Sequence, residues 1–377
     1  MFLRNYWYVG AYAAEIGEKP LARTLLGEPV LLYRTADGRA VALEDRCCHR
    51  NLPLSMGARE GDAIRCGYHG LKFDSAGRCI EIPGQAQIPP DAKVRAYPVI
   101  ERWNFIWLWM GDPAKRDEAL LPGWQCIDDP SLTTTMGNGC QALPMKCNWE
   151  LNNDNLLDLM HVVYVHPGTL GGAGLDNNPV TTLRLENSVR MMRWSANVEP
   201  VPLLAKLAGF NGTVSDRWQA TTCELPSHCT IDAGFAEAGK VGRDGDWDQG
   251  VRLRALITAT PETEMTSFMF YAQCRNFALG NEEVSKRFIQ QIRAIFDQDI
   301  AVMEGQQRVN SMLPNAPTVE IRCDVPVVAM HRLVLQAAAK ERGEPITVTR
   351  VDPTTPRAMQ PVPSPVTQPI EVGPASR

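Results

Sequence analysis

The amino-acid sequence predicts an α+β protein with two domains, an all-β domain followed by a domain that mixes strands and helices. Three observations lead to this fold class. The chain has 377 residues, which is enough for two hydrophobic cores. Its first 115 or so residues contain short apolar runs separated by turn signals. Beyond them, helical spacing near residues 150–165 and 284–308 flanks strand-like runs between 180 and 275.

The first domain is expected to consist of short antiparallel strands. Residues 30–34 and 40–43 are apolar runs joined through Asp37-Gly38, a dipeptide typical of tight hairpin turns. Further short apolar runs follow at 71–73, 79–82 and 105–110. Gly111-Asp112-Pro113 then interrupts the pattern. We therefore expect the all-β domain to occupy residues 1–117.

The second domain is expected to span residues 118–351, where the strand-like and helical patterns alternate without an internal repeat. After Val351 the chain becomes rich in proline and poor in apolar residues, as in Pro361-Val362-Pro363-Ser364-Pro365. Such a composition cannot bury enough apolar surface to form a core. Residues 352–377 are therefore expected to be a disordered tail or an extended arm.

The charge balance restricts the partners of the protein. Lys and Arg number 38 against 43 Asp and Glu, giving a formal charge of −5, so neither nucleic acid nor an anionic membrane is expected as a partner. The N-terminus lacks a signal-peptide pattern, and no run of about 18 apolar residues occurs, so a cytoplasmic protein is expected. In that compartment the eleven cysteines favour thiols and metal ligands over a disulfide framework.

Two short loops carry the strongest chemical signal. Cys47 and His49 form a Cys-x-His pair, and Cys66 and His69 form a Cys-x₂-His pair. A Rieske [2Fe-2S] cluster needs two cysteines on one iron and two histidines on the other, which these loops supply. A zinc site is the alternative, although zinc fingers usually pair Cys with Cys and His with His. Cys48 is expected to be a buried thiol. The same expectation holds for Cys79, Cys126, Cys140, Cys147, Cys223, Cys229, Cys274 and Cys323.

A second group of potential ligands lies in the helical stretch near 150–165. Asp158 and His161 are three residues apart and share a helix face, whereas His166 is about 140° further round from His161. Both histidines can reach one metal if the helix ends between them, and Pro167 provides that ending. Two ordinary hydrogen-bonded histidines are the alternative. Four of the six histidines nevertheless fall in these two patterns, and only His228 and His331 do not.

The long helix predicted at 284–308 offers a carboxylate for the same metal. Asp299 continues the apolar stripe formed by Phe288, Ile292, Ile295 and Val302, so its side chain is expected to be buried, where an unpaired carboxylate is costly. Asp297 is expected to face solvent and Glu304 lies off the stripe. A two-histidine, one-carboxylate iron site of His161, His166 and Asp299 would explain the buried charge. A buried salt bridge is the alternative.

These residues resemble the Rieske non-haem iron oxygenases, in particular the branch of vanillate O-demethylase and dicamba O-demethylase, over nearly the whole chain. The resemblance implies a Rieske [2Fe-2S] domain followed by a helix-grip catalytic domain, assembled as a homotrimer. It also implies that Asp158 links His69 of a neighbouring chain to His161 as an electron bridge, with Asn155 supporting the site. Cys48 and Gly67 depart from the family pattern without touching a ligand position. The resemblance is carried by Arg4-Asn5-Tyr6-Trp7-Tyr8-Val9, Cys47, His49, Arg50, Cys66, Tyr68, His69, Gly70, Asn155, Asp158, His161 and His166.

The resemblance implies an enzyme that receives electrons from NAD(P)H through a separate reductase, carrying flavin or [2Fe-2S], or through a ferredoxin. Its mononuclear iron would use O₂ for the oxidative O- or N-dealkylation of an aromatic compound. Ring hydroxylation or dihydroxylation is an alternative, because the same ligands support both reactions. A non-catalytic electron-transfer protein is a further alternative from a different class, and it would not need the iron triad.

Overall fold

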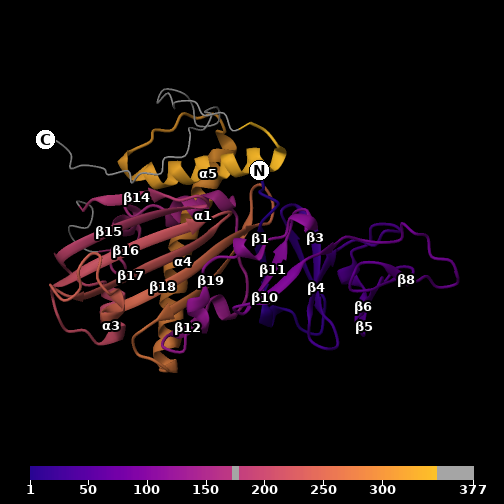
Figure 1. Cartoon of the computed structure of the whole chain (residues 1–377), viewed down its shortest axis with the longest axis horizontal. Helices are drawn as coiled ribbons and strands as arrows, with labels where there is room; N and C mark the ends of the chain where they lie inside the picture. The colour runs from indigo at the N-terminus through magenta and orange to yellow at the C-terminus, as the bar shows by residue number, and fades with distance from the viewer. Residues whose placement is uncertain (172–177, 346–377) are drawn as a thin grey trace. The chain divides into compact units, whose positions relative to one another are not determined.

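The computed structural model describes residues 1–171 and 178–345 (Figure 1). The chain divides into two compact units. The first consists of Met1–Leu121, Gly139–Pro144 and Thr260–Phe270, and the second of the remaining described residues. The tail predicted at 352–377 lies outside the described residues.

The first unit is built almost entirely from antiparallel strands, which confirms the all-β prediction. The predicted hairpin lies in β3 and β4, where Arg34 pairs with Ala40, and Gly38 has a positive φ of 87° that suits the turn. One sheet has the order β1 (Trp7–Tyr12), β11 (Phe105–Trp109), β10 (Val99–Arg102). A second has the order β2 (Leu21–Leu25), β3 (Glu28–Arg34), β4 (Ala40–Glu44), β9 (Ala96–Tyr97), and a third β5 (Ala58–Glu60), β6 (Ala63–Arg65), β7 (Lys72–Phe73), β8 (Cys79–Glu81).

Two hydrophobic clusters hold this unit together. One packs the side chains of β1, β3 and β11, among them Tyr8, Leu32 and Leu108. The other packs Leu43, Ile64 and Phe73 together with the sulfur-bearing side chains of the two Cys/His loops. The loops that carry Cys47 and Cys66 are therefore anchored in a core of their own.

A large antiparallel sheet lies mostly in the second unit, and most of its strands run through the residues predicted to be strand-like; Leu143–Pro144, Thr260–Pro261 and Ser267–Phe270, at the ends of three of its strands, belong to the first unit. Its order is β12 (Thr133–Met136), β19 (Ser267–Arg275), β18 (Val251–Pro261), β17 (His228–Glu237), β16 (Ser215–Glu224), β15 (Ser188–Val198), β14 (Val180–Arg184), with β13 (Leu143–Met145) also paired to β19. The helices are α1 (Trp149–Leu156), α2 (His161–Val165), α3 (Pro202–Ala208), α4 (Glu282–Met312) and α5 (Val325–Arg342). Short 3₁₀ helices occur at Ala13–Glu15, Leu54–Met56, Pro113–Lys115, Glu118–Leu120, Gln125–Asp128, Gly137–Gly139, Trp247–Gln249 and Arg322–Asp324.

The long helix α4 packs against β19. The ring centroids of Tyr271 and Phe296 are 4.7 Å apart, and the Arg275 guanidinium donates to Ser285 Oγ over 2.9 Å. The side chain of Asn281 begins α4 by accepting a hydrogen bond from the Val284 amide. No helix in the described ranges is both long and apolar enough to span a membrane.

The stretch predicted as one helix near 150–165 is two helices, α1 and α2, with a break between them. At the break the Asp158 carboxylate accepts a hydrogen bond of 2.7 Å from the Met160 amide. Asp side chains that bond to nearby backbone amides favour such interruptions over a continuous helix. His161 is consequently the first residue of a new helix rather than part of the last turn of a long one.

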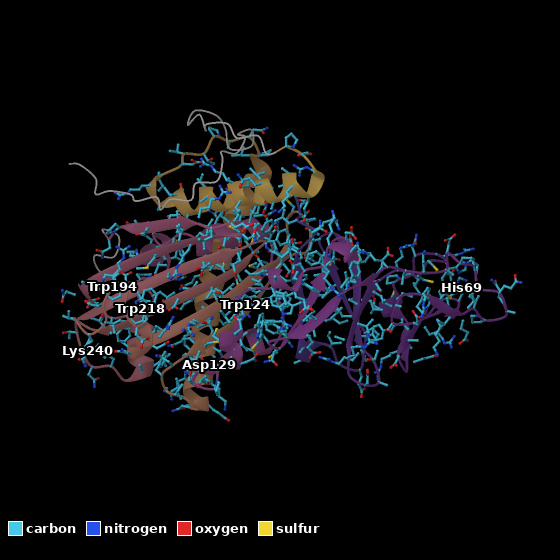
Figure 2. All side chains as sticks on the ribbon, viewed as in Figure 1. His69, Trp124, Asp129, Trp194, Trp218 and Lys240 are labelled. Atoms are coloured by element: carbon cyan, nitrogen blue, oxygen red, sulfur yellow. A yellow bond between two sulfur atoms is a disulfide. The ribbon has the colours of Figure 1, made fainter. Side chains whose placement is uncertain are left out.

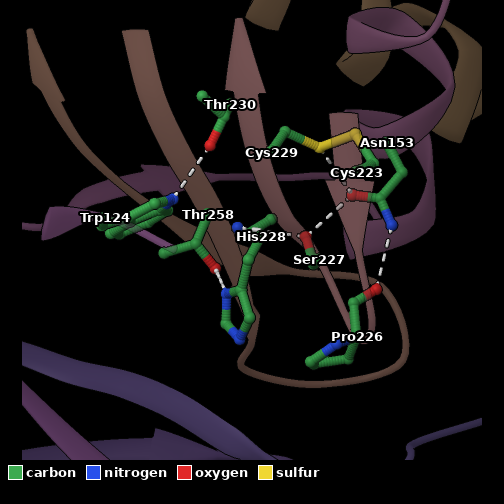
Figure 3. The surroundings of a disulfide bond; sticks show 10 residues. Trp124, Asn153, Cys223, Pro226, Ser227, His228, Cys229, Thr230 and Thr258 are labelled. Carbon is green, nitrogen blue, oxygen red and sulfur yellow. Dashed lines mark hydrogen bonds between the residues drawn. A yellow bond between two sulfur atoms is a disulfide. The ribbon is translucent and has the colours of Figure 1, made fainter. Parts of the chain in front are cut away.

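Cys223 and Cys229 form a disulfide bond, so the expectation that both are thiols is wrong (Figure 3). The two residues are direct partners in the register of β16 and β17, with Cα atoms 4.1 Å apart. The six-residue spacing encloses the turn of this hairpin. The pairing depends on strand register, which the spacing of the cysteines alone does not reveal.

Candidate metal centres

The two Cys/His loops have the same local geometry. In the first, the Cys47 amide donates to Leu52 O over 2.8 Å, and the Asn51 amide donates to Cys47 O over 2.9 Å. In the second, the Cys66 amide donates to Leu71 O, and the Gly70 amide donates to Cys66 O. Asn51 and Gly70, each four residues after a cysteine, both adopt positive φ. The two cysteines thus begin turns with the same backbone hydrogen bonds.

The two thiols are buried, whereas both imidazoles are exposed. The His49 and His69 rings lie 4.6 Å apart between centroids, and the exposed Tyr68 ring lies 3.9 Å from that of His69, which is labelled in Figure 2. Burial, with a contribution from nearby Cys66, raises the pKa of the Cys47 thiol to about 11. A bound metal would hold this sulfur as a thiolate at neutral pH. Two inner thiolates and two outer imidazoles fit a [2Fe-2S] cluster with one histidine-bound iron.

A second set of ligand atoms comes together in the other unit. One side-chain atom from each of His161, His166 and Asp299 lies within 4.8 Å of those of the other two. His166 Nε2 is 2.9 Å and His161 Nε2 is 3.6 Å from Asp299 Oδ1. His166 and Asp299 are almost fully buried. Two imidazoles and one carboxylate on one side of a site leave positions for O₂, as in non-haem iron oxygenases.

Local sequence explains how the two histidines converge. α2 ends at Val165, and His166 leaves the helical conformation with φ −124° and ψ 47°, immediately before Pro167. A residue before proline is disfavoured in the α region. The helix therefore ends between the two histidines, and their rings meet nearly perpendicular to each other, at 81°.

The third side chain projects from the middle of α4. Phe288, Ile292, Ile295 and Asp299 are buried along one face, as the helical spacing predicts. Beyond Asp299 the buried face of the helix shifts by one residue. Val302 is 41% exposed, and the neighbouring Met303 is buried instead. Asp297 is exposed and pairs with Arg293 over 2.8 Å.

The sequence matches two described families. Residues 6–98 match the Rieske [2Fe-2S] domain, and residues 145–341 match the vanillate O-demethylase oxygenase C-terminal domain. The chain belongs to this family of Rieske oxygenases. It is the oxygenase component of a monooxygenase system, an oxidoreductase whose cofactors are a [2Fe-2S] cluster and a mononuclear iron.

Relatives of this Rieske oxygenase cover nearly its whole length. It is 40% identical over 329 residues, 86% of this chain and 93% of the relative, to the iron-sulfur subunit of a toluene-4-sulfonate monooxygenase system from Comamonas testosteroni. It is 33% identical to the vanillate O-demethylase oxygenase subunit of Pseudomonas sp. strain HR199, covering 93% and 99% of the two chains. The crystal structure of dicamba monooxygenase bound to 3,6-dichlorosalicylic acid superposes with a TM-score of 0.85 at 31% identity, covering 91% and 99%.

Three further side chains of the oxygenase support the histidines and the carboxylate. Asn155 Nδ2 donates to Asp299 Oδ1 over 3.2 Å, and Asp158 Oδ2 lies 3.8 Å from His161 Nδ1. Gln298 Oε1 lies 2.7 Å from His166 Nδ1, a contact that the sequence argument missed. Gln298 directly precedes Asp299 on α4, but adjacency on a helix does not predict convergence on one site.

The surroundings shift the pKa values of the two histidines of the triad in opposite directions. Burial acts to lower the pKa of His166, but its hydrogen bond to Asp299 outweighs burial and the pKa is raised. Burial lowers the pKa of His161, although Asp299 and Asp158 oppose the change. His161 is thus held in the neutral form that binds metals.

His228 and His331 lie outside the triad. Figure 3 shows His228, whose Nδ1 is 2.9 Å from Thr258 Oγ1, with the Trp124 ring edge-on at 6.0 Å. His331 Nε2 on α5 is 2.6 Å from Asp154 Oδ1 on α1. Both rings have polar partners typical of structural histidines.

Proposed function

We propose that this oxygenase inserts one oxygen atom of O₂ into an alkyl group bound to oxygen or nitrogen of a small aromatic compound. The second oxygen atom leaves as water, with two electrons and two protons supplied through a reductase or ferredoxin. The resulting hemiacetal or hemiaminal splits into the dealkylated aromatic compound and an aldehyde. The observation that carries the proposal is the buried cluster of His161, His166 and Asp299 in a chain that also has the Cys/His loops.

We assign the iron to His161, His166 and Asp299, and the [2Fe-2S] cluster to Cys47, Cys66 and their histidine partners. When bound, the cluster supplies single electrons and the iron activates O₂. The cluster ligands in full are Cys47, His49, Cys66 and His69.

The surrounding residues orient the ligands. Gln298 holds His166 Nδ1, so that Nε2 faces Asp299, and Asn155 holds one oxygen of the same carboxylate. Partners of this kind fix ligand orientation and protonation. Burial of His166 and Asp299 keeps bulk water away from one side of the site.

Asp158 is assigned the electron bridge, acting between His161 of its own chain and His69 of a neighbouring chain in a homotrimer. Two observations support this assignment. The Asp158 side chain is 29% exposed beside His161, and His69 is exposed on its loop. Both groups are thus accessible to another chain.

We propose that residues 1–117 form the Rieske domain, residues 118–351 the catalytic domain and residues 352–377 a tail. We place the enzyme in the cytoplasm because NAD(P)H is available there.

Hydroxylation without dealkylation is the second candidate. The relative from Comamonas testosteroni is named for toluene-4-sulfonate, a compound that carries no alkyl group on oxygen or nitrogen. The same iron ligands would serve oxygen insertion into a ring methyl group or into the ring itself.

Product analysis separates the candidates. The holoenzyme, with cluster and iron, is reduced and exposed to ¹⁸O₂ with methoxylated, N-alkylated and methyl-substituted aromatic acids. Release of an aldehyde with loss of the alkyl group supports dealkylation. A labelled hydroxyl group retained on the product supports hydroxylation. Absence of any oxidised product, with a cluster that is reduced normally, would refute both and favour an electron-transfer protein.

A further inference from the structure

Two buried arginines face the segment that carries the two histidines of the proposed iron site. Arg193 on β15 and Arg217 on β16 are 3% and 4% exposed. Neither belongs to the metal centres described above. An arginine is rarely as buried as Arg217 without an ionic partner.

The strand register places both side chains on the same face of the sheet. Ser195 pairs with Arg217 and Arg193 pairs with Gln219, so the two arginines are diagonal neighbours, about 7–8 Å apart or somewhat less at Cβ. The alternate residues Trp194 and Trp218, labelled in Figure 2, point to the opposite face, where their rings stack 6.3 Å apart. This alternation follows from the two-residue period of a strand.

The arginine-bearing face is directed toward α1 and α2. Cys229, a register partner of Cys223 on the same face as Arg217, has its sulfur 3.9 Å from Asn153 Oδ1 on α1. Arg193 donates over 3.5 Å to the carbonyl of Leu159, two residues before His161. Arg217 donates to the carbonyls of Leu170 and Gly171, whose amides in turn bond to His166 O. The two guanidinium groups therefore bracket the segment that holds the two histidines.

The charge of Arg217 has no close counterion among the described residues. Its hydrogen bonds go to the two backbone carbonyls, and the electrostatic attraction comes from Glu199, which is exposed and makes no ion pair with it. Burial and the nearby charge of Arg193 lower the pKa of Arg217 to about 9. A buried cation in such surroundings is costly unless an anion binds to it.

A buried hydroxyl group lies on the same face. Thr221 pairs with Met191 in the register, two residues from the Arg193–Gln219 pair, and is fully buried. Its Oγ1 has no hydrogen-bond partner within the described part of the chain. An unpartnered buried hydroxyl is unfavourable in the free protein and can donate to an anionic oxygen.

We propose that Arg217, with Arg193 beside it and Thr221 on the same face, binds an anionic substituent of the aromatic substrate, a carboxylate or a sulfonate. A planar guanidinium recognises either group through two parallel hydrogen bonds. The relatives named for vanillate and toluene-4-sulfonate are named for anions of these two kinds. The identity of the bound molecule as the substrate depends on the proposed function; the anion site itself does not.

Anaerobic calorimetry with the holoenzyme tests the site independently of turnover. Two matched pairs of probes are used, toluene-4-sulfonate with its neutral sulfonamide, and vanillate with its neutral amide. Arg217→Met should weaken binding of at least one anion by about 30-fold or more, because removal of a buried charged partner costs at least about 2 kcal/mol. Its effect on the neutral probes should stay below about threefold. Whichever anion loses affinity identifies the carboxylate or the sulfonate as the preferred group.

Two further variants separate binding from folding. Arg190→Met removes an exposed arginine from the opposite face of β15 and should leave all four affinities unchanged. Arg217→Lys keeps the positive charge but cannot form the two parallel hydrogen bonds of a guanidinium, so it should retain part of the preference for anions. This variant still tests the site if Arg217→Met does not fold. Without ligand, Arg217→Met should unfold at the same temperature as the wild type or higher, since it removes an uncompensated buried charge.

The proposal is overturned if Arg217→Met and Arg217→Lys leave anion affinity unchanged, or if they weaken anionic and neutral probes equally. A lower unfolding temperature of Arg217→Met with unchanged anion preference would show that the guanidinium only caps the backbone carbonyls. Anion binding that depends on Arg217 without any oxidised product would refute the proposed function and leave the anion site in place. Turnover of aromatic compounds without any preference for anions would support the proposed function and refute the anion site.

Discussion

Replacement of Asp299 by alanine tests the assignment of the iron ligands. The carboxylate has one oxygen 2.9 Å from His166 Nε2 and 3.6 Å from His161 Nε2, and it is the only anionic group of the triad. Loss of a residue that merely supports a ligand typically costs 10–100-fold in metal affinity. Loss of the charged ligand itself should therefore cost more than about 100-fold, or about 2.7 kcal/mol.

The assay is iron content after desalting, measured beside the visible spectrum of the cluster and the rate of product formation. The wild type should hold about three irons per chain, two of them in the cluster. Asp299→Ala should hold about two, with an unchanged cluster spectrum and product formation at background. Asp297→Ala is the matched control, because Asp297 is a neighbour on α4 whose exposed side chain pairs with Arg293. It should keep all three irons and its activity.

Two results would refute the reasoning. Retention of three irons and turnover in Asp299→Ala would show that Asp299 is not a ligand. Equal iron contents of about two in the wild type and the variant, with a lower unfolding temperature only in the variant, would make Asp299 a structural partner of His166. That outcome corresponds to the buried salt bridge considered from the sequence.

Three other perturbations have defined outcomes. Gln298→Leu should lower iron affinity by about 10–100-fold while excess iron restores occupancy, as measured by iron titration, because Gln298 orients His166. Asp158→Asn should keep both cofactors but lower turnover by about 10–100-fold, with a cluster that is still reduced and then reoxidises slowly in stopped-flow absorbance. Burial raises the pKa of Tyr33 from 10.0 to about 12, so its contribution to folding, about 2–3 kcal/mol, is complete below pH 10 and is lost as the pH rises toward 12. Urea unfolding of the wild type should show this loss over that pH range, and Tyr33→Phe should show a smaller loss, because burial also raises the pKa of Tyr97 and Tyr271.

The sequence was most informative where ligands are close along the chain. The pairs Cys47/His49 and Cys66/His69 each lie within one turn, so short-range spacing alone indicates a shared site. The interruption at Pro167 likewise predicts how His166 leaves its helix. The family relationship and the all-β nature of the first unit also followed from such local patterns.

Helical periodicity predicted the burial of Asp299 but not which residues beyond it are buried. Exposure of Val302 and burial of Met303 show that the contact face drifts over the 31 residues of α4. A 3.6-residue period does not repeat evenly over many turns, and the surface that a long helix covers changes along its length. Periodicity is thus reliable near the centre of a stripe and weaker at its ends.

Features that depend on pairing between distant strands could not be predicted. The Cys223–Cys229 disulfide and the neighbouring positions of Arg193 and Arg217 follow from the register of β15, β16 and β17. A shift of one residue would move either arginine to the opposite face. The contact of Gln298 with His166 similarly joins segments 132 residues apart.

The placement of the two sites on different kinds of element has a consequence for selectivity. The proposed iron ligands come from α2 and α4, whereas the proposed anion site comes from β15 and β16. Arg217 and Arg193 are hydrogen-bonded to backbone carbonyls on either side of the His161–His166 segment, so these contacts hold the anion site at a fixed place relative to the two histidines. A substrate anchored by its anionic group would then present to the iron only the substituent that its ring geometry places at that distance. Positional isomers of one methoxylated or methylated acid should therefore bind with similar affinity but differ in the amount of product formed per electron consumed.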